Sequence, residues 1–548
     1  MKATKKVLCM LLAAIFAVSV FAGCKGNGTT TSSAAGADTS SAADSKKPGK
    51  VDTTEAVTFT LMFGEHATEL YHEDTWVIAP WVKEKYNVDL EITAVPSSDW
   101  ATKQSTTISS QDIPDLLMGV ARDVANEYGP KGTFLNLHDY LDYMPNLQKC
   151  MEGFPLLKTW MSYSDKEMYS QATTLATEGA VNMTAYYIQF IRKDIMDECG
   201  ITEMPKTFDD LYNVLKAMKK KYPNAYPWIN RQKFNMIVNV FAPGLGFDCS
   251  PMACNNTGWG VWKEDSKEFT SIMEEENFRW FLEWMSKLYK EGLIDPSYAS
   301  DDTTTWQDKL TTSQGFFSVD YFSRPDTMNL AGKKNYDKFD LEPMLTPALE
   351  GGQQKIYANV GVGGSNVFNG KCENPERLAA MLDGWYYSEE GCLLMTYGVE
   401  GKTYTKNADK TLSKIYTDEI ATSLDFDAAY GVNYLTFYAF KPDFFGYDLY
   451  DTNQSETYNN TWNLFKDEQI DLPPTVIYNA DETEAYTEVA TDVGPTGTTI
   501  LNVFNEFIIG RRDISDDAAW EAAKKELNDA GYQDFLDNLN AAYKRMNG

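Results

Sequence analysis

The side chains that most often carry proton transfer or metal binding are scarce in this chain. Histidine occurs only as His66, His72 and His138, and there is no H-E-x-x-H motif and no C-x-x-C pair. Those motifs set imidazoles or thiolates at the spacing that a zinc ion requires. The sequence therefore predicts neither a metal site nor a cofactor.

Two glycine-containing segments approach catalytic motifs without completing them. Gly363-Gly364-Ser365-Asn366-Val367 lacks the last glycine of a G-x-S-x-G nucleophile turn. Gly401-Lys402-Thr403 resembles the end of a phosphate-binding loop, but Thr396 stands where such a loop needs its first glycine. We interpret Gly361-Val362-Gly363-Gly364 as a tight chain crossing rather than as a phosphate cradle.

Carboxylates leave one enzyme class open. Hydrolysis of a glycosidic bond needs two of them about 5–10 Å apart, and the chain has 79 aspartates and glutamates. The net charge of −30 at pH 7 repels nucleic acid and anionic membrane surfaces. It also disfavours a polyanionic ligand, unless a local basic patch overrides it. We expect no nucleic-acid partner.

Aromatic residues give the positive signal, with 13 Trp, 32 Tyr and 28 Phe. Flat rings stack on the apolar faces of sugars while neighbouring polar groups bind the hydroxyls. Core packing is the commoner role for any single ring, so only the surplus as a whole favours a carbohydrate ligand.

The N-terminus has the organisation of an export signal. Lys2, Lys5 and Lys6 precede the apolar run from Val7 to Phe21, which is shorter than the roughly 20 residues of a spanning helix. Ala22-Gly23 then lead to Cys24, which resembles the lipobox of bacterial lipoproteins. That resemblance implies removal of a signal peptide, residues 1–23, and attachment of acyl chains, palmitate among them, to Cys24. An ordinary secretory signal with a chance cysteine is the alternative.

Residues 24–56 contain mainly small and polar residues and are interpreted as a flexible tether behind the lipidated cysteine. We therefore expect an extracytoplasmic protein anchored to the outer face of the cytoplasmic membrane. Beyond Cys24 six cysteines remain, too few for a disulfide scaffold in so long a chain. Cys249 and Cys254 are close enough to pair, and the sequence leaves open whether they do.

Alternating and helical patterns predict an α/β fold. Residues 57–63 and 88–93 alternate in the manner of strands, residues 76–86 between them form a helix, and residues 112–118 lead into a short buried strand. Four further helices are predicted from their end signals. One begins at a capping box of Thr207 and Asp210, a second ends at Gly292, and a third begins at Asn374-Pro375. The C-terminal region from Ser515 is helical, with a break at Gly531.

Several segments resemble the family 1 extracellular solute-binding proteins, the lipoproteins that serve sugar importers. They are Ile191-Arg192-Lys193-Asp194, Pro205 to Leu211, Asn374 to Gly391, Tyr397 to Gly401, and Phe507 to Gly510 with Asp513-Ile514. The likeness covers nearly the whole chain from about residue 57. The family implies a two-lobed, periplasmic-binding-protein-like fold of type II, with hinge segments and a ligand in the cleft.

The resemblance also implies the organisation and the partners. We expect one lobe from residues 57–180 plus 358–430 and another from residues 181–357 plus 431–548. The implied protein is a monomer and not an enzyme, and it captures a carbohydrate for the permease subunits of an ABC importer. Some relatives carry a calcium loop after the helix that ends near Lys221, but residues 222–228 here have too few carboxylates for that metal.

Comparison with the positions that bind ligand in the resembled family suggests which residues bind ligand here. In the first lobe these follow two strands, and in the second they follow an apparent turn, a strand and the second crossing. Three tryptophans are further stacking candidates. The set is Glu65, His66, Arg122, Asp123, Trp228, Asn230, Arg231, Trp259, Trp306, Tyr321, Arg324, Tyr357 and Asn359.

Two other functions stay open from the sequence. The same scaffold serves many ligands, so a peptide or another polar solute is the second binding hypothesis. A surface enzyme that degrades glycans is the third.

Overall fold

The computed structural model describes residues 51–65, 71–176, 187–231, 234–252, 256–358, 361–420, 423–432, 445–446, 448–451 and 456–547. Two large buried cores organise them. The first core joins residues 57–172 to residues 362–395, and the second joins residues 187–357 to residues 476–542. The chain therefore leaves and re-enters each core. Within the described ranges, every helix is too short or too polar to cross a membrane.

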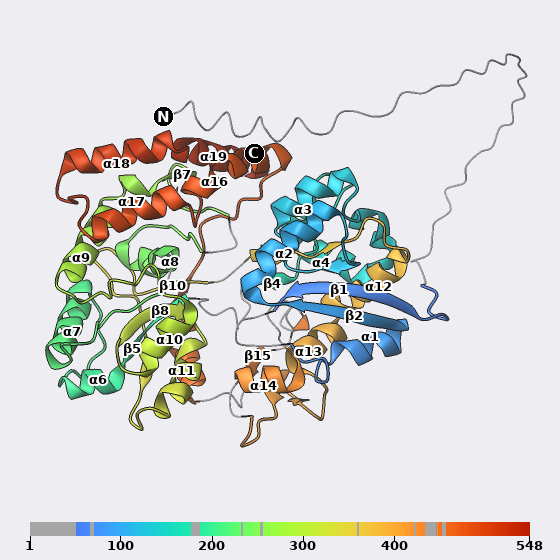
Figure 1. Cartoon of the computed structure of the whole chain (residues 1–548), viewed down its shortest axis with the longest axis horizontal. Helices are drawn as coiled ribbons and strands as arrows, with labels where there is room; N and C mark the ends of the chain where they lie inside the picture. The colour runs from blue at the N-terminus through green and yellow to red at the C-terminus, as the bar shows by residue number, and fades with distance from the viewer. Residues whose placement is uncertain are drawn as a thin grey trace, which may run out of the picture. The chain divides into compact units, whose positions relative to one another are not determined.

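A four-stranded sheet, in the order β12-β3-β1-β2, lies in the first core (Figure 1). β1 (Val57–Gly64) is parallel to β2 (Val88–Val95) and to β3 (Leu116–Leu117), whereas β12 (Val367–Phe368) is antiparallel to β3. The strands predicted at residues 57–63 and 88–93 are thus confirmed, and residues 112–118 lead into the short buried strand β3 as expected.

The two faces of β1 pack against different helices. Phe59, Leu61 and Phe63 are buried in the first core, which also contains the apolar side of α1 (Ile78–Tyr86). Met62 packs on the other side with residues of α2 (Ser97–Ser110). The alternation in the sequence arises because successive side chains of a strand point to opposite faces.

The first core is completed by helices on both sides of this sheet. The helix predicted at residues 76–86 begins at Ile78, so Pro80 lies in the first turn, where its missing N–H has no partner in the helix. The others are α3 (Arg122–Tyr128), α4 (Pro145–Gly153), α5 (Pro155–Met161), α12 (Pro375–Tyr387) and α13 (Glu389–Tyr397), with the 3-10 segments η1 (Gly129–Lys131) and η2 (Leu137–Tyr143).

The second core contains an antiparallel sheet in the order β8-β5-β9. β5 (Tyr187–Arg192) is its middle strand and is buried at every position, between β8 (Phe317–Tyr321) and β9 (Leu341–Met344). One face of the sheet packs on α8 (Phe234–Leu245), whose residues are all buried, and the other on a smaller apolar cluster around Trp306. A strand covered on both faces is apolar throughout, as β5 is apart from Gln189 and Arg192.

The helices around the second sheet start and stop at the predicted signals. α7 begins at the capping box: Thr207 Oγ1 accepts from the backbone N–H of Asp210, and the Asp210 carboxylate accepts from Thr207 N–H. Gly292 and Gly531 adopt positive φ after α9 and before α19. The helices are α6 (Lys193–Glu198), α7 (Phe208–Lys221), α9 (Glu276–Lys290), α10 (Thr303–Thr311), α11 (Arg324–Lys333), α15 (Glu456–Phe465), α16 (Ala480–Val493), α17 (Thr498–Ile508), α18 (Asp517–Asp529) and α19 (Tyr532–Asn547), with η3 (Ile272–Glu274).

The glycine-rich segment forms part of a two-stranded crossing between the sequence ranges of the two cores. β11 (Gly361–Gly363) pairs antiparallel with β4 (Thr174–Ala176). Gly364 has φ +66°, and a Cβ there would lie 1.9 Å from Thr173 Oγ1. The backbone conformation and the close approach both require glycine, as expected for a tight crossing.

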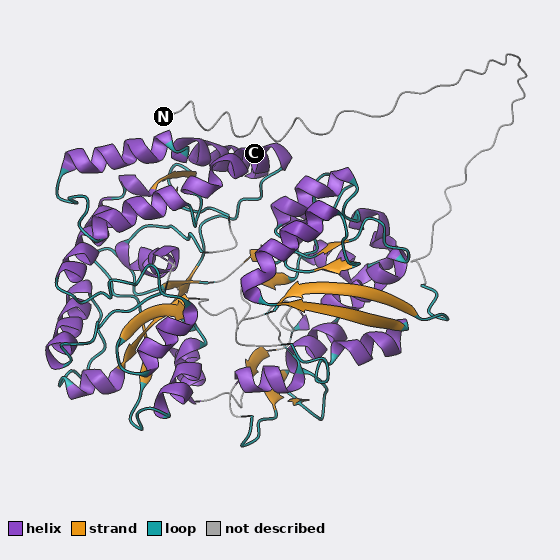
Figure 2. Ribbon diagram, viewed as in Figure 1, coloured by secondary structure: helices purple, strands orange, loops and turns teal. Residues whose placement is uncertain are grey.

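The remaining strands form small sheets apart from the two central ones (Figure 2). β15, assigned from the sequence to the second lobe, pairs with β14, assigned to the first, so this sheet spans that expected boundary. The strands are β6 (Gly260–Lys263) with β7 (Glu268–Ser271), β10 (Ile356–Tyr357) with β16 (Gln469–Ile470), and β13 (Tyr404–Lys406) with β14 (Thr411–Lys414) and β15 (Asp448–Asp451); α14 spans Ser423–Tyr430.

Candidate ligand site

Five of the residues proposed from the sequence lie together at the end of β8. They come from the segment before α8, from α10, from β8 itself and from the start of α11: Asn230, Arg231, Trp306, Tyr321 and Arg324. We call them, with Asp320, the β8-end cluster. β8 delivers Asp320 and Tyr321 as neighbours, whereas the sequence separates Arg231 from Asp320 by 89 positions.

Asp320 is the centre of the cluster. Arg231 donates from Nε to Asp320 Oδ2 at 2.5 Å and from Nη2 to Oδ1 at 3.1 Å, and Arg324 donates from Nε to Oδ1 at 3.0 Å. The Asp320 side chain is 0% exposed. Burying a carboxylate is costly unless cations and hydrogen bonds compensate it, and here two guanidinium groups do so.

The charge of Arg231 is held firmly. Burial acts against the charged form, but the hydrogen bond and charge of Asp320 outweigh it and raise the pKa of Arg231. The Nη1 group donates to Thr303 Oγ1 at 2.8 Å, and the Tyr321 hydroxyl is a further hydrogen-bond partner. Every nitrogen of this guanidinium therefore has a partner.

Tyr321 presents the partly exposed ring of the cluster. The guanidinium carbons of Arg231 and Arg324 lie 5.4 and 5.5 Å from its ring centroid, and the Tyr187 ring lies 5.3 Å away. Cations near an aromatic face fix the orientation of the ring. Tyr187 opens β5 directly opposite Tyr321, so two tyrosines stand side by side at this end of the sheet.

The three proposed stacking tryptophans are all placed in packed interior. Trp228, Trp259 and Trp306 are each 0% exposed. Trp306 donates from Nε1 to Ser318 Oγ, and Trp259 donates to the carbonyl of Gly494. As placed, these rings offer no surface to a ligand; Trp306 instead lies beneath both guanidinium groups, 5.7 and 5.8 Å from their carbons.

Arg122 and Asp123 lie at the start of α3, away from the β8-end cluster. Arg122 donates to the backbone carbonyls of Trp160, Ser162 and Tyr478 at 2.6–3.2 Å. Burial lowers the pKa of Arg122 to about 10. Its guanidinium is therefore committed to the backbone, while Asp123 beside it remains partly exposed.

The other proposed residues are separate from one another. Glu65 follows β1 and accepts from the backbone N–H of Tyr71. Tyr357 is buried, and its hydroxyl accepts from the N–H of Cys249, whose thiol is not bonded to another cysteine. His66, Cys254, Asn359 and the proposed lipidation site Cys24 lie outside the described residues.

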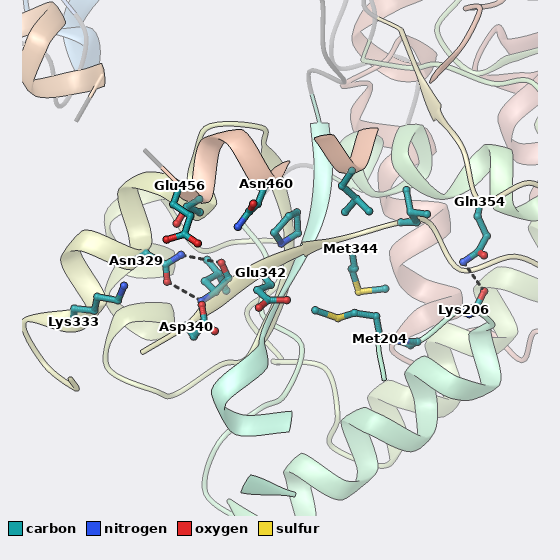
Figure 3. Close-up of a pocket in the computed structure, with 16 residues that line it drawn as sticks. Met204, Lys206, Asn329, Lys333, Asp340, Glu342, Met344, Gln354, Glu456 and Asn460 are labelled. Carbon is teal, nitrogen blue, oxygen red and sulfur yellow. Dashed lines mark hydrogen bonds between the residues drawn. The ribbon is translucent and has the colours of Figure 1, made fainter. Parts of the chain in front are cut away.

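A cavity that the sequence did not suggest lies along the edge strand β9 (Figure 3). Its volume is about 550 Å³, and it is lined from β9, α11, α15 and the segment before α7. Burial, followed by neighbouring carboxylates, raises the pKa of Asp340 and of Glu342 on its wall. No group of three His, Cys, Asp or Glu side chains suited to a metal occurs in the described part of the chain.

The β8-end cluster does not have the arrangement of a glycosidase. Its carboxylate, Asp320, is fully buried, and both oxygens accept hydrogen bonds from guanidinium groups. A general acid must hold a proton and reach its substrate. What the cluster can do is bind, with an oriented ring and hydrogen-bond donors.

Sequence reasoning missed Asp320 and Tyr187. A signal for Asp320 was present, because the run Phe316-Phe317-Ser318-Val319-Asp320 is otherwise suited to a buried strand. A carboxylate in such a strand requires a cation. Which cation it finds depends on the fold.

A family model matches part of the chain. The model for bacterial extracellular solute-binding proteins matches residues 67–264. The chain is related to the family 1 extracellular solute-binding proteins. Over these residues, the family resemblance expected from the sequence is confirmed.

Curated relatives match parts of the chain. The fructooligosaccharide ABC transporter substrate-binding protein FusA of Streptococcus pneumoniae serotype 4 is 28% identical over 306 residues, 53% of this chain and 54% of FusA. The polygalacturonan/rhamnogalacturonan-binding protein YtcQ of Bacillus subtilis is 24% identical over 349 residues, 61% of this chain and 64% of YtcQ. The chain thus spans little more than half to just under two thirds of these relatives.

Solved structures match over nearly the whole fold. The alginate-binding protein AlgQ2 without calcium ion has a TM-score of 0.71 at 21% identity, covering 90% of this chain and 99% of that one. FusA of S. pneumoniae in complex with kestose has a TM-score of 0.66 at 18% identity, with the same coverage. The predicted two-lobed α/β, periplasmic-binding-protein-like fold is therefore confirmed.

Proposed function

We propose that this protein captures an oligosaccharide between its two lobes and delivers it to an ABC importer. The observation that carries the proposal is the β8-end cluster: Tyr321 is partly exposed, oriented by two guanidinium groups, and beside a second tyrosine. An oriented ring with donors at its edge suits a sugar, which has an apolar face and a rim of hydroxyls. FusA and YtcQ, named as carbohydrate-binding proteins, support the same class of ligand.

In this proposal the lobes comprise residues 57–180 with 358–430 and residues 181–357 with 431–548. The crossing formed by β4 and β11 is a hinge segment, and the lobes close on the ligand. Closure follows the ligand only to the extent that the closed form binds it more tightly. The proposed ligand-facing residues are Tyr321 and Arg324 from one lobe and Glu65 and Asp123 from the other, while Arg231 and Asn230 support the cluster from within. His66 and Asn359 remain candidates from the sequence alone.

We further propose that the protein is a monomer on the outer face of the cytoplasmic membrane, held by acyl chains on Cys24. The relative LipO of B. subtilis, 26% identical over 335 residues, is named as a lipoprotein. Replacing Cys24 with Ser is expected to move the protein from the membrane fraction to the soluble fraction, which immunoblotting of fractionated cells measures. Equal membrane retention of the Cys24→Ser protein would contradict the lipid anchor.

The function is tested by a thermal-shift screen of oligosaccharides and peptides, followed by calorimetry on each ligand found. A ligand that binds the native state raises the melting temperature, by an amount that grows with its concentration above Kd. We expect shifts with oligosaccharides only, and no new reducing ends after prolonged incubation. A shift with peptides alone, or the appearance of reducing ends, would overturn the proposal.

A further inference from the structure

The guanidinium group of Arg324 donates a hydrogen bond to the protein from only one of its three nitrogens. Its side chain is 14% exposed, and its Nε donates to Asp320 at 3.0 Å. Among the described residues, neither terminal nitrogen of Arg324 has a hydrogen-bond acceptor. The four N–H groups on these two nitrogens are therefore open to water or to a ligand.

Arg231 provides the contrast within the same cluster. It uses Nε and Nη2 on Asp320 and Nη1 on Thr303. Both guanidinium groups pair with Asp320 and lie near the rings of Trp306 and Tyr321. Only Arg324 keeps its two terminal nitrogens, here called the Arg324 fork, without an acceptor in the described residues. The difference shows which of the two remains able to bind something else.

The cluster also carries an excess of positive charge. Two guanidinium groups pair with one carboxylate, Asp320, and the described residues place no second carboxylate within ion-pair distance of either group. Two other buried acids of the same core, Asp295 and Asp301, both pair with Lys309, at 2.7 and 2.5 Å. This local excess is notable in a chain whose net charge is −30.

A planar, bidentate donor matches a carboxylate better than it matches a hydroxyl. The two terminal nitrogens of a guanidinium lie at the separation of two carboxylate oxygens, and charge-assisted bonds of this kind are about twice as strong as neutral ones. The partly exposed Tyr321 ring, whose centroid is 5.5 Å from the Arg324 carbon, lies where a sugar ring bearing that carboxylate would stack.

We propose that the saccharide bound here carries a carboxylate, as a uronic acid residue does, and that the Arg324 fork binds it. This inference rests on the proposed function and specifies its ligand. It also explains how an acidic protein accepts an anionic ligand: the favourable contact is local and mostly buried, where the distant negative charges are screened by salt.

The test is calorimetry of the mature protein with matched pairs of oligosaccharides. Each pair contains a uronic acid oligomer (galacturonate, mannuronate, guluronate or glucuronate) and the neutral hexose oligomer of the same length and linkage, or the methyl ester of the acid. We expect an acid to bind about 10- to 100-fold more tightly than its neutral counterpart, the range for a hydrogen bond to a charged group. The preference should weaken as salt is raised.

Variants assign the preference to Arg324. Arg324→Gln is expected to remove most of the acid preference while retaining binding of the sugar rings, and Arg324→Lys to leave a smaller preference because it keeps the charge without the fork. Lys334→Gln, which removes an exposed cation just after the same helix, is the matched control and should change nothing. The melting temperature of each ligand-free variant checks that it folds.

The outcomes separate this inference from the function on which it depends. If neutral oligosaccharides bind as tightly as acids, or if Arg324→Gln keeps the acid preference, the inference fails and carbohydrate capture stands. If no saccharide of either set binds, carbohydrate capture itself fails.

Discussion

Two buried aspartates, one in each core, have their carboxylates compensated by different kinds of partner. Asp320 in the second core is neutralised by two guanidinium groups. Asp383 in the first core, 3% exposed on α12, accepts only N–H groups: the backbone of Asn146 and Leu147 and the Asn146 side chain, at 2.7–3.2 Å. It closes the start of α4, whose first N–H groups have no partner in the helix.

The difference separates a proposed binding site from a purely structural contact. All the hydrogen bonds that Asp383 accepts come from N–H groups of Asn146 and Leu147. Burial raises the pKa of Asp383 to about 6. Asp320 instead pairs with two guanidinium groups, and one of them, Arg324, keeps its two terminal nitrogens available for a further hydrogen-bond acceptor. In the proposed function, the free N–H groups of Arg324 distinguish the ligand site from the contact that Asp383 makes with α4.

The largest effect is expected from removing the charge of Asp320. Asp320→Asn leaves two mostly buried guanidinium groups without their counter-ion, which should lower the free energy of unfolding by about 3–5 kcal/mol. Urea denaturation measures it. The control is Asp517→Asn, because Asp517 is 88% exposed in its ion pair with Arg279 and should contribute less than about 1 kcal/mol. Equal losses in the two variants would remove the distinction between buried and exposed pairs.

The contribution of Asp383 to the free energy of unfolding should depend on pH. In the folded state the pKa of Asp383 is about 6, above its usual value of 3.8, so the folded state binds the proton more tightly than the unfolded state. Its contribution to stability is therefore present at low pH and is lost as pH rises from about 4 through 6, by roughly 2–3 kcal/mol. Unfolding of wild type and Asp383→Asn across that range measures the difference. A difference that is flat with pH would contradict the assignment.

Two arginines sharpen the same comparison. Arg122→Met removes the donor to three backbone carbonyls, and leaving such acceptors without partners costs about 1–3 kcal/mol. Arg324→Met should cost less, because only Nε of Arg324 bonds to the protein. Chemical denaturation gives the stabilities and calorimetry the ligand affinities. We expect Arg122→Met to affect mainly stability and Arg324→Met mainly binding, and the reverse pattern would place the ligand near α3 instead.

The smallest effect is expected at the ring of Tyr321. Tyr321→Ala removes a stacking surface, which should weaken oligosaccharide binding about 3- to 10-fold. Tyr321→Phe keeps the ring and is the control. Affinities come from titration calorimetry, and an unchanged affinity of Tyr321→Ala would remove Tyr321 from the site.

Sequence reasoning identified the members of the β8-end cluster other than Asp320, but not their arrangement. Tyr321, Arg231 and Arg324 were proposed by position against the family, and the structure brings them within a few ångströms of one carboxylate. The same reasoning treated Arg122 as equivalent, since it also follows a strand. The carbonyls that occupy Arg122 come from residues 160, 162 and 478, and no local pattern connects them to it.

The sequence by itself determined the elements and their ends, because those depend on neighbours along the chain. The alternation in β1, the capping box at Thr207 and the breaks at Gly292 and Gly531 are interactions within a few residues. Only the tertiary structure decided which aromatic rings are buried and which arginine keeps its terminal nitrogens free of protein acceptors. The reason is that burial and ion pairing bring together residues far apart in the sequence, such as Arg231 and Asp320, which are 89 positions apart.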